Sequence, residues 1–200
     1  MLYPIQHRNP PTRTHKAYWE GFLTPDEINF ILAQPEWLKT ATGVVADGTG
    51  KTEQNAESRI TDVGWLGPKP ELMPIWDKFS ALVAEVNRQY FQFDLTGLYE
   101  PMQLGVYTGE KGGHYSWHTD TGMNDVGVPR KLSVVLCLSD PSEFEGGELQ
   151  LMDSKGNPET LELKKGRAWF FPSFLIHRVT PVTKGVRRSI VLWVGGPAFK

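Results

Sequence analysis

Six short apolar runs follow one another in the second half of the chain, and they constrain the fold more than any other sequence feature. Their sequences are RKLSVVLCLSD, GGELQLM, ETLELKKG, RAWFFPS, IHRVTPV and RRSIVLWVGG, and glycine or proline turns separate them. Each run has the length of a strand and is rich in β-branched or aromatic residues. Several such strands in series predict a β-sandwich, a barrel or a jelly roll.

Two helices are predicted before these strands. In LTPDEINFILA, Thr24 is an expected N-cap, Pro25 takes the first helical position and Glu27 completes a capping box. The stretch from Glu71 to Phe93 places apolar residues three or four positions apart, which is typical of an amphipathic helix. We therefore expect an α+β fold, in which N-terminal helices buttress one face of a β-body.

The composition agrees with one domain. The chain has 200 residues, of which 40% are hydrophobic, and this is enough for a substantial core. We expect helical support over about residues 20–93 and a β core over about 95–196. The net charge is −2, and no block of like charge suggests a nucleic-acid or anionic-membrane surface. The oligomeric state is left open.

The single cysteine and the N-terminus bear on location. Cys137 excludes an internal disulfide framework and any multi-cysteine metal cluster, and its apolar neighbours predict a buried thiol. The N-terminal residues lack the apolar run of a signal peptide, and no stretch is apolar for long enough to span a bilayer. These features predict a soluble protein of a reducing, cytoplasmic compartment.

Two polar segments are candidate walls or lids for a binding site. TATGVVADGTGKTEQNAESRI, at residues 40–60, is rich in glycine and threonine and is predicted to be a mobile loop. TGMNDVGVPR, at residues 121–130, has a similar texture. Whether the 40–58 and 121–130 loops close over a ligand or are surface excursions is left open by the sequence.

HYSWHTD, at residues 114–120, raises the possibility of a metal site. In an extended chain the side chains of His118 and Asp120 point to the same side, so they can share one ion. His177 is the only histidine downstream of Asp120. Two histidines and one carboxylate form the facial triad of non-haem Fe(II) oxygenases. The alternative is a polar turn for the first pair and a hydrogen-bonded strand-end histidine for His177.

A basic residue, Arg187, lies ten positions after His177. In a strand it shares a face with Ser189, Val191 and Trp193, whereas Arg188 lies on the opposite face. An arginine that faces the interior needs an anion, and a guanidinium matches a carboxylate with two parallel hydrogen bonds. Either face could be the inner one, and a solvated basic strand end is the alternative.

Together, these motifs resemble the Fe(II)/2-oxoglutarate dioxygenase superfamily, most closely its prolyl 4-hydroxylase-like branch. The resemblance covers roughly residues 95–195 and rests on His118-Thr119-Asp120, EGGELQL and FPSFLIHRVTPVTKGVRRS. It implies a double-stranded β-helix, or jelly roll, with iron bound by His118, Asp120 and His177. It also implies that Arg187 and Ser189 bind the distal carboxylate of 2-oxoglutarate. Tyr107 and Trp193 match, less specifically, a tyrosine of the cosubstrate pocket and an aromatic residue near the metal.

Differences within the superfamily narrow the expected reaction. Many animal and plant prolyl 4-hydroxylases have lysine at the position of Arg187. Nucleic-acid demethylases carry a second arginine six positions on, where this chain has Trp193, so nucleobase repair is not expected. Halogenating relatives replace the metal carboxylate, whereas Asp120 is present. The resemblance therefore favours hydroxylation with Fe(II), 2-oxoglutarate and O2, and with ascorbate as the expected reductant.

The substrate is less well determined. The resemblance favours a prolyl residue in a peptide or protein, which would be hydroxylated with release of succinate and CO2. A free amino acid or small metabolite is the alternative, and a non-catalytic jelly roll that holds Zn(II) or Ni(II) is a third possibility. Candidate substrate contacts, each of which could instead be a surface or packing residue, are Arg59, Trp117, Arg130 and Trp193. Of these, Trp117 is expected to face away from the iron ligands.

Overall fold

Two antiparallel sheets form the body of the protein. The computed structural model describes residues 14–43, 45–46, 52–53, 55–124 and 126–198. In this part of the chain, the larger sheet has nine strands in the order β1-β14-β10-β16-β8-β6-β2, with β7 and β11 also paired to β16. They are β1 (Ala17–Trp19), β2 (Ala41–Thr42), β6 (Asp62–Leu66), β7 (Gly97–Leu98), β8 (Met102–Thr108), β10 (Arg130–Cys137), β11 (Phe144–Gly146), β14 (Ala168–Pro172) and β16 (Val182–Gly195).

The smaller sheet has five strands in the order β13-β12-β15-β9-β5 within the described residues. They are β5 (Arg59–Ile60), β9 (His114–His118), β12 (Leu149–Met152), β13 (Pro158–Leu161) and β15 (His177–Val179). A separate hairpin joins β3 (Val45–Ala46) to β4 (Thr52–Glu53). The six strands that the sequence predicted are confirmed as β10, β12, β13, β14, β15 and β16.

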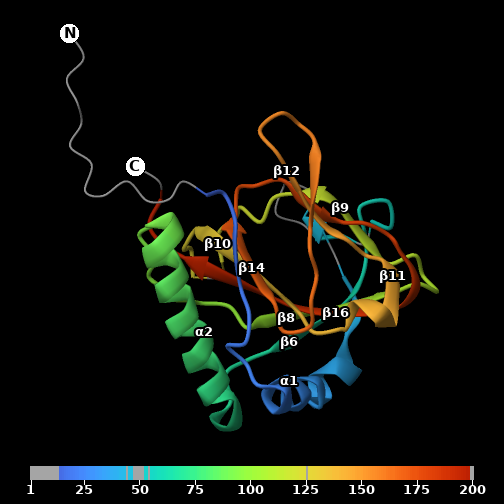
Figure 1. The fold of residues 1–200 in the computed structure, drawn as a ribbon, viewed down its shortest axis with the longest axis horizontal. Helices are drawn as coiled ribbons and strands as arrows, with labels where there is room; N and C mark the ends of the chain where they lie inside the picture. Colours follow the sequence, from blue (N-terminus) through green and yellow to red (C-terminus); the bar gives the residue numbers. More distant parts are fainter. Residues whose placement is uncertain (1–13, 44, 47–51, 54, 125, 199–200) are drawn as a thin grey trace.

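The helices cover the outer face of the larger sheet, as predicted. Alternation along β10 and β16 points one set of side chains toward α1 (Pro25–Leu32) and α2 (Met73–Val86), where a large apolar cluster forms. A second cluster lies between the two sheets. Figure 1 shows α2 and α1 at the periphery of the β-body. The α+β jelly-roll prediction is therefore confirmed.

Local signals set the helix ends. The predicted capping box is present, because the Glu27 backbone N–H donates to Thr24 Oγ1 at 3.2 Å and the Thr24 N–H donates to the Glu27 carboxylate at 2.7 Å. The predicted helix over 71–93 is shorter than expected. A 3₁₀ turn (Pro70–Leu72) precedes α2, and a π turn (Asn87–Phe91) follows it and ends at Gln92 with φ of 53°.

Residues 14–66 contribute more strand than the sequence suggested. The prediction of a loop is wrong for Ala41–Thr42, which pair with β6, and for Arg59–Ile60, which pair with β9. Part of that segment lies outside the described residues. The strands β1 and β6 were also not predicted, and both add to the larger sheet. The physical reason is that two- to five-residue edge strands gain their stability from neighbours in space, which a local pattern does not contain.

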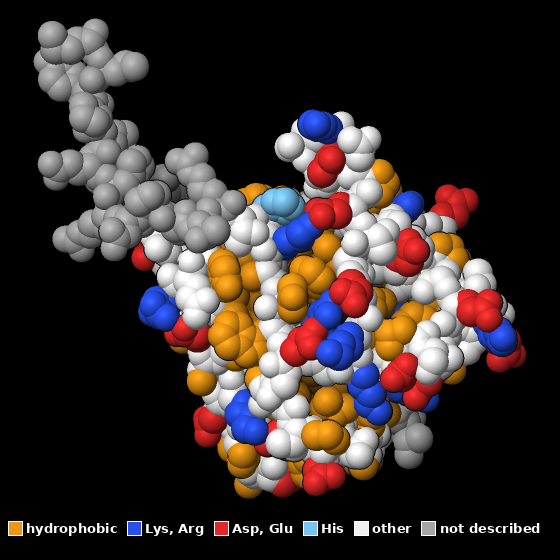
Figure 2. All heavy atoms as spheres, viewed as in Figure 1, with side chains coloured by type: hydrophobic (Ala, Val, Ile, Leu, Met, Phe, Trp, Pro, Cys, Tyr) orange, Lys and Arg blue, Asp and Glu red, His pale blue; other side chains and the backbone are white. Residues whose placement is uncertain are grey.

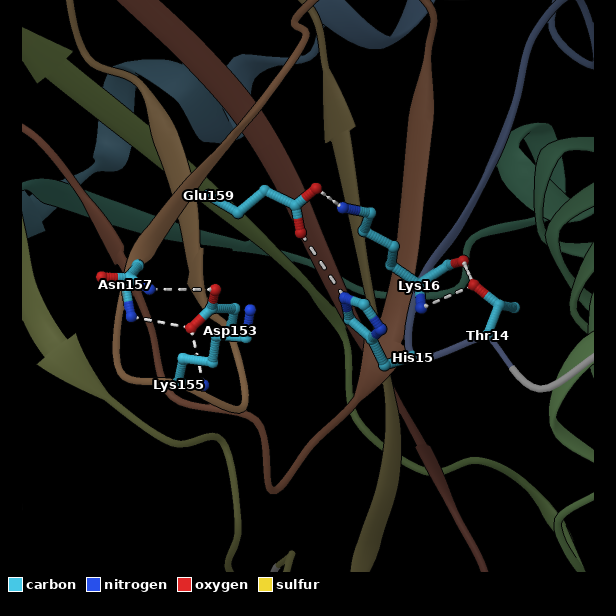
Figure 3. A network of polar contacts seen from close by, with 7 residues as sticks. All are labelled: Thr14, His15, Lys16, Asp153, Lys155, Asn157 and Glu159. Atoms are coloured by element: carbon cyan, nitrogen blue, oxygen red, sulfur yellow. Dashed lines mark hydrogen bonds and ion pairs between the residues drawn. The ribbon is translucent and has the colours of Figure 1, made fainter.

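Polar contacts fix the β12–β13 hairpin and the chain that precedes β1 (Figure 3). Asp153 accepts hydrogen bonds from the backbone N–H groups of Lys155 and Asn157 at 2.8 and 2.7 Å, which closes the hairpin turn. On β13, the Glu159 carboxylate pairs with Lys16 and lies 3.5 Å from His15. This pairing holds the residues before β1 against the smaller sheet.

Charge is dispersed over the face of the molecule that Figure 2 shows. On the face shown in Figure 2, basic and acidic side chains are interspersed rather than grouped by sign. No helix among the described residues is long and apolar enough to cross a membrane. Cys137 is buried as a free thiol, as predicted, and burial raises its pKa.

The cluster beneath the helices predicts a large stability cost for truncation. Phe170 on β14 is fully buried there, so Phe170→Ala should lower the free energy of unfolding by about 3–5 kcal/mol through lost burial and a residual cavity. Phe30 on α1 is 40% exposed, and Phe30→Ala should change it by about 1 kcal/mol or less. Urea unfolding of both variants would check this. Equal losses would contradict the assigned core.

Candidate metal centre and cosubstrate pocket

The three predicted metal ligands come together on neighbouring strands of the smaller sheet. His118 ends β9, Asp120 follows two residues later, and His177 begins β15 directly opposite His118. Their ligand atoms all lie within 4.8 Å of one another. His118 Nε2 lies 3.7 Å from Asp120 Oδ1, and His177 Nε2 lies 3.5 Å from Asp120 Oδ2. This arrangement can hold one metal ion on one face.

Backbone carbonyls orient both imidazoles. His118 Nδ1 lies 2.8 Å from the carbonyl of Ser116, and His177 Nδ1 lies 2.9 Å from the carbonyl of Leu175. A carbonyl only accepts, so in each neutral ring Nδ1 carries the proton and donates it. The Nε2 lone pairs are then free to bind the metal, which is the usual arrangement of a metal-bound histidine.

His118 and Asp120 have the protonation states that a cation needs. Burial, together with the nearby His177, lowers the pKa of His118 to about 4, so this imidazole is neutral at neutral pH. Burial alone would raise the pKa of Asp120. The two histidines and the Ser133 hydroxyl outweigh burial and hold that pKa below its ordinary value, which keeps the carboxylate ionised.

Two buried serines hold the metal carboxylate in place, and the sequence analysis missed both. Ser133 Oγ donates to Asp120 Oδ2 at 2.7 Å, and Ser173 Oγ lies 3.0 Å from Ser133 Oγ. The backbone N–H of Asp120 also donates to the Ser173 carbonyl at 2.9 Å. One signal could have found Ser133, because it is a small polar residue in the apolar run KLSVVLC.

Arg187 faces the interior, which resolves the choice between the two faces of β16. Its side chain is fully buried, and its guanidinium lies 5.1 Å from the centre of the Tyr107 ring. Nη1 donates to Ser189 Oγ at 3.1 Å, whereas Nε and Nη2 have no partner in the described part of the chain. No carboxylate of the described residues forms an ion pair with Arg187. A buried cation with two unused donors is a fitted site for a ligand carboxylate.

One cavity of about 250 Å³ joins the metal ligands to Arg187. Three predicted residues, Tyr107, Ser189 and Trp193, line it together with the metal ligands.

The second glycine of EGGELQL, Gly147, leaves room for the side chain of Arg187. Gly147 has φ of +62°, and a Cβ there would lie 3.0 Å from Arg187 Cδ. A side chain at this position would therefore crowd the arginine.

The predicted substrate contacts divide into two groups. Arg59 and Arg130 line the cavity, as Trp193 does. Trp117 does not line it, because alternation along β9 turns its ring away from His118 and toward Arg178, whose guanidinium lies 4.4 Å from the ring centre. Of the 121–130 segment, Thr121 and Arg130 reach the cavity. A lid role for that segment stays a prediction.

Each cavity arginine has a different partner. Arg130 forms a two-pronged ion pair with Glu100 and lies 3.7 Å over the Trp193 ring. Arg59 Nη2 donates to Gln103 Oε1 at 3.1 Å, and its Nε has no partner among the residues that the structure describes. Arg59 also lies 4.5 Å over the ring of Tyr115. Glu100, Gln103 and Tyr115 were not predicted, because their roles depend on strand pairing.

Comparison with known proteins decides the family. Residues 102–195 match the family model described as the 2OG-Fe(II) oxygenase superfamily. A PKHD-type hydroxylase of Nitrosomonas europaea is 34% identical over 185 residues, which cover 88% of this chain and 76% of that protein. The chain belongs to the 2OG-Fe(II) oxygenase superfamily. This oxygenase is also 30% identical to a PKHD-type hydroxylase of Janthinobacterium over 183 residues, 86% of this chain and 74% of that one.

Solved structures show the same fold. A prolyl hydroxylase from Trichoplax adhaerens, in complex with a peptide fragment of the hypoxia inducible factor oxygen degradation domain, matches with a TM-score of 0.73 and 19% identity. That match covers 91% of this chain and 84% of the other. A prolyl-4-hydroxylase from Pseudomonas putida matches with a TM-score of 0.66 and 19% identity, over 92% and 94% of the two chains. The expected double-stranded β-helix is therefore confirmed.

The cofactors of this superfamily fit the site. Enzymes of the superfamily use Fe(II), 2-oxoglutarate and O2. His118, Asp120 and His177 supply the two imidazoles and one carboxylate that suit Fe(II), and the unused donors of Arg187 suit a carboxylate of the cosubstrate. When bound there, Fe(II) and 2-oxoglutarate would activate O2, which is the oxidant that turns a C–H bond into C–OH. The protein orients the ligands, excludes water and places the substrate.

The serine pair predicts a role in metal affinity. Ser133→Ala removes the hydrogen bond to Asp120 Oδ2, so it should weaken Fe(II) binding by about 10- to 100-fold, the usual effect of losing a partner of a metal ligand. Ser133→Thr keeps the hydroxyl and should retain most of the affinity. Anaerobic Fe(II) titration of the metal-free protein would measure this. Unchanged affinity in Ser133→Ala would show that Asp120 is held without the serine.

The buried arginine predicts a contrast between neighbours. Arg187→Met should weaken 2-oxoglutarate binding by about 3–5 kcal/mol, the typical cost of removing one partner of a buried charge pair. Arg188→Met is the matched control, because Arg188 lies on the opposite face of the same strand and outside the cavity. The anaerobic 2-oxoglutarate dissociation constant would be measured for both. Equal effects would refute the assignment of Arg187 as the residue that binds the distal carboxylate of 2-oxoglutarate.

Proposed function

We propose that this oxygenase hydroxylates a prolyl residue within a peptide or a protein. In each turnover, one O2 and one 2-oxoglutarate are consumed, and one hydroxylated residue, one succinate and one CO2 are formed. The observation that carries this chemistry is the shared cavity, which brings the fully buried Arg187 and its unused N–H donors to the same space as the metal ligands. A structural metal site needs no such arginine.

The choice of a prolyl substrate is supported by the structural neighbours and by the residues of the cavity wall. The structural neighbours include prolyl hydroxylases, one of them in complex with a peptide. Beside the metal ligands, the rings of Tyr115 and Trp193 line the cavity, together with the apolar side chains of Val135 and Val179. Such a wall suits an uncharged ring such as pyrrolidine, which offers weakly polar C–H bonds.

Individual residues would act before the chemical step. Arg187 and Ser189 would fix the distal carboxylate of 2-oxoglutarate, which sets how far the cosubstrate reaches toward the metal ligands. Tyr115 stacks on His118 with ring centroids 3.5 Å apart, so it covers one side of that ligand against water. Burial raises the pKa of Tyr115, and its phenol stays neutral.

One observation favours a different substrate, a free amino acid or another small acid. Arg59 is a second buried guanidinium on the cavity wall, and no carboxylate of the described residues pairs with it. A small substrate could place its own carboxylate there.

A cytoplasmic location and the use of ascorbate as reductant stay predictions.

A substrate panel would test the proposal. The enzyme would be incubated with Fe(II), 2-oxoglutarate, ascorbate and, in turn, proline-rich peptides, free amino acids and small acids. We expect one oxygen atom to be added to a prolyl peptide, with one succinate formed per hydroxylation. A robust mass shift on a free amino acid, with no peptide reacting, would refute the peptidyl substrate and leave the oxygenase assignment intact.

A further inference from the structure

A second cavity, of about 410 Å³, adjoins the metal cavity. The two share part of their walls, because Arg59 and Gln103 line both. The remaining wall of the second cavity comes mainly from β2, β6 and the 3₁₀ turn at Pro35–Lys39, and includes Lys39, Ala41, Gly43 and Trp65. None of the metal ligands reaches it.

The strand register places both cavities on one face of the larger sheet. Gln103 on β8 lies directly opposite Val191 of β16 on one side and Trp65 of β6 on the other. Residues paired in this way point to the same face of a sheet, so the face that carries Arg187 and Trp193 continues across Gln103 to Trp65. The ring centroids of Trp65 and Trp193 lie 6.4 Å apart. The second cavity is therefore an extension of the active-site face toward the edge strand β2.

Arg59 stands at the junction of the two cavities. It comes from β5 of the smaller sheet and reaches across to Gln103 of the larger one. Gly43 keeps this junction open, because a Cβ there would lie 2.9 Å from Arg59 Nε. A substrate that extends from the metal into the second cavity would pass this arginine.

We propose that the second cavity is a substrate subsite, which binds the stretch of an extended peptide next to the hydroxylated residue. This inference rests on the proposed function and deepens it. The first cavity has to hold 2-oxoglutarate and the reacting residue within about 250 Å³, so the flanking residues of a peptide need space outside it. A free amino acid would end in the first cavity and leave the second unused.

The lining of the second cavity suits a peptide segment. Trp65 is 45% exposed and offers an indole face to an apolar or pyrrolidine ring of a flanking residue. The Gln103 amide and the exposed Lys39 can meet backbone carbonyls or an acidic side chain.

A nested series of peptides tests the subsite. A prolyl peptide that the enzyme hydroxylates would be shortened stepwise from each end, and kcat/KM would be measured by succinate release and mass shift. We expect removal of the residues that flank the reacting proline on one side to lower kcat/KM about tenfold, chiefly through a higher KM. A tenfold change equals ~1.4 kcal/mol, which is the scale of one aromatic contact. In Trp65→Ala, the long and short peptides should react within about twofold of each other.

Two further variants make the result decisive. Ala41→Trp fills the cavity from β2 and should also abolish the preference for the long peptide, whereas Phe30→Ala on α1, outside both cavities, should keep it. Thermal melts would confirm that each variant is folded. If peptides react with the same length preference in the wild type, Trp65→Ala and Ala41→Trp, the subsite is refuted and the proposed function stands. If no peptide reacts and a free amino acid does, both are refuted.

Discussion

The register of β16 is the constraint on which the rest of the structure depends. One face of this strand packs Ile190, Leu192 and Val194 beneath the helices, and the other carries Arg187 and Ser189 into the cavity. Because side chains alternate strictly, a shift of one residue would exchange the two faces and place a charge in the apolar cluster. Neighbours on both sides, β8 and β10, hold the register over six and seven residue pairs. The apolar core and the position of Arg187 are therefore specified by the same pairing of β16 with its two neighbours.

The metal centre depends on a second pairing, that of β9 with β15. This pairing sets His177 opposite His118, and the carbonyls two residues before each histidine fix both rings. Asp120 lies just beyond the strand and is held by Ser133 from β10 of the larger sheet. The ligand set thus joins the two sheets. A buried carboxylate is costly without a cation, so the site is organised in advance for metal rather than for stability.

Much of the fold and of the metal site could be predicted from the sequence, and the features that could not be predicted share a physical reason: they depend on strand pairing. The strands after residue 130, the capped helix at Thr24 and the spacing of His118, Asp120 and His177 are local patterns, which a single chain displays directly. The choice between Arg187 and Arg188 was not local, because both faces of β16 contain apolar residues. Ser133 and Ser173 are 40 positions apart in sequence and meet only through sheet pairing. The short strands β2 and β5 lie in a glycine-rich stretch whose composition resembles a loop.

Charge pairing separates the roles of the three cavity arginines. Arg130 is neutralised by Glu100 and stacked on Trp193, so it shapes the wall and presents little free charge to a ligand. Arg187 is fully buried in the cavity wall and has unused donors, which suit a cosubstrate carboxylate. Arg59 is buried, joined to an amide rather than a carboxylate, and placed between two cavities. The carbonyl oxygens of a neutral peptide backbone can accept hydrogen bonds from the N–H groups of Arg59 and leave its charge unneutralised. The sheet face from Trp193 to Trp65 therefore combines two indole rings with one central donor group, Arg59, which can donate to the backbone carbonyls of a peptide or to the carboxylate of a small acid.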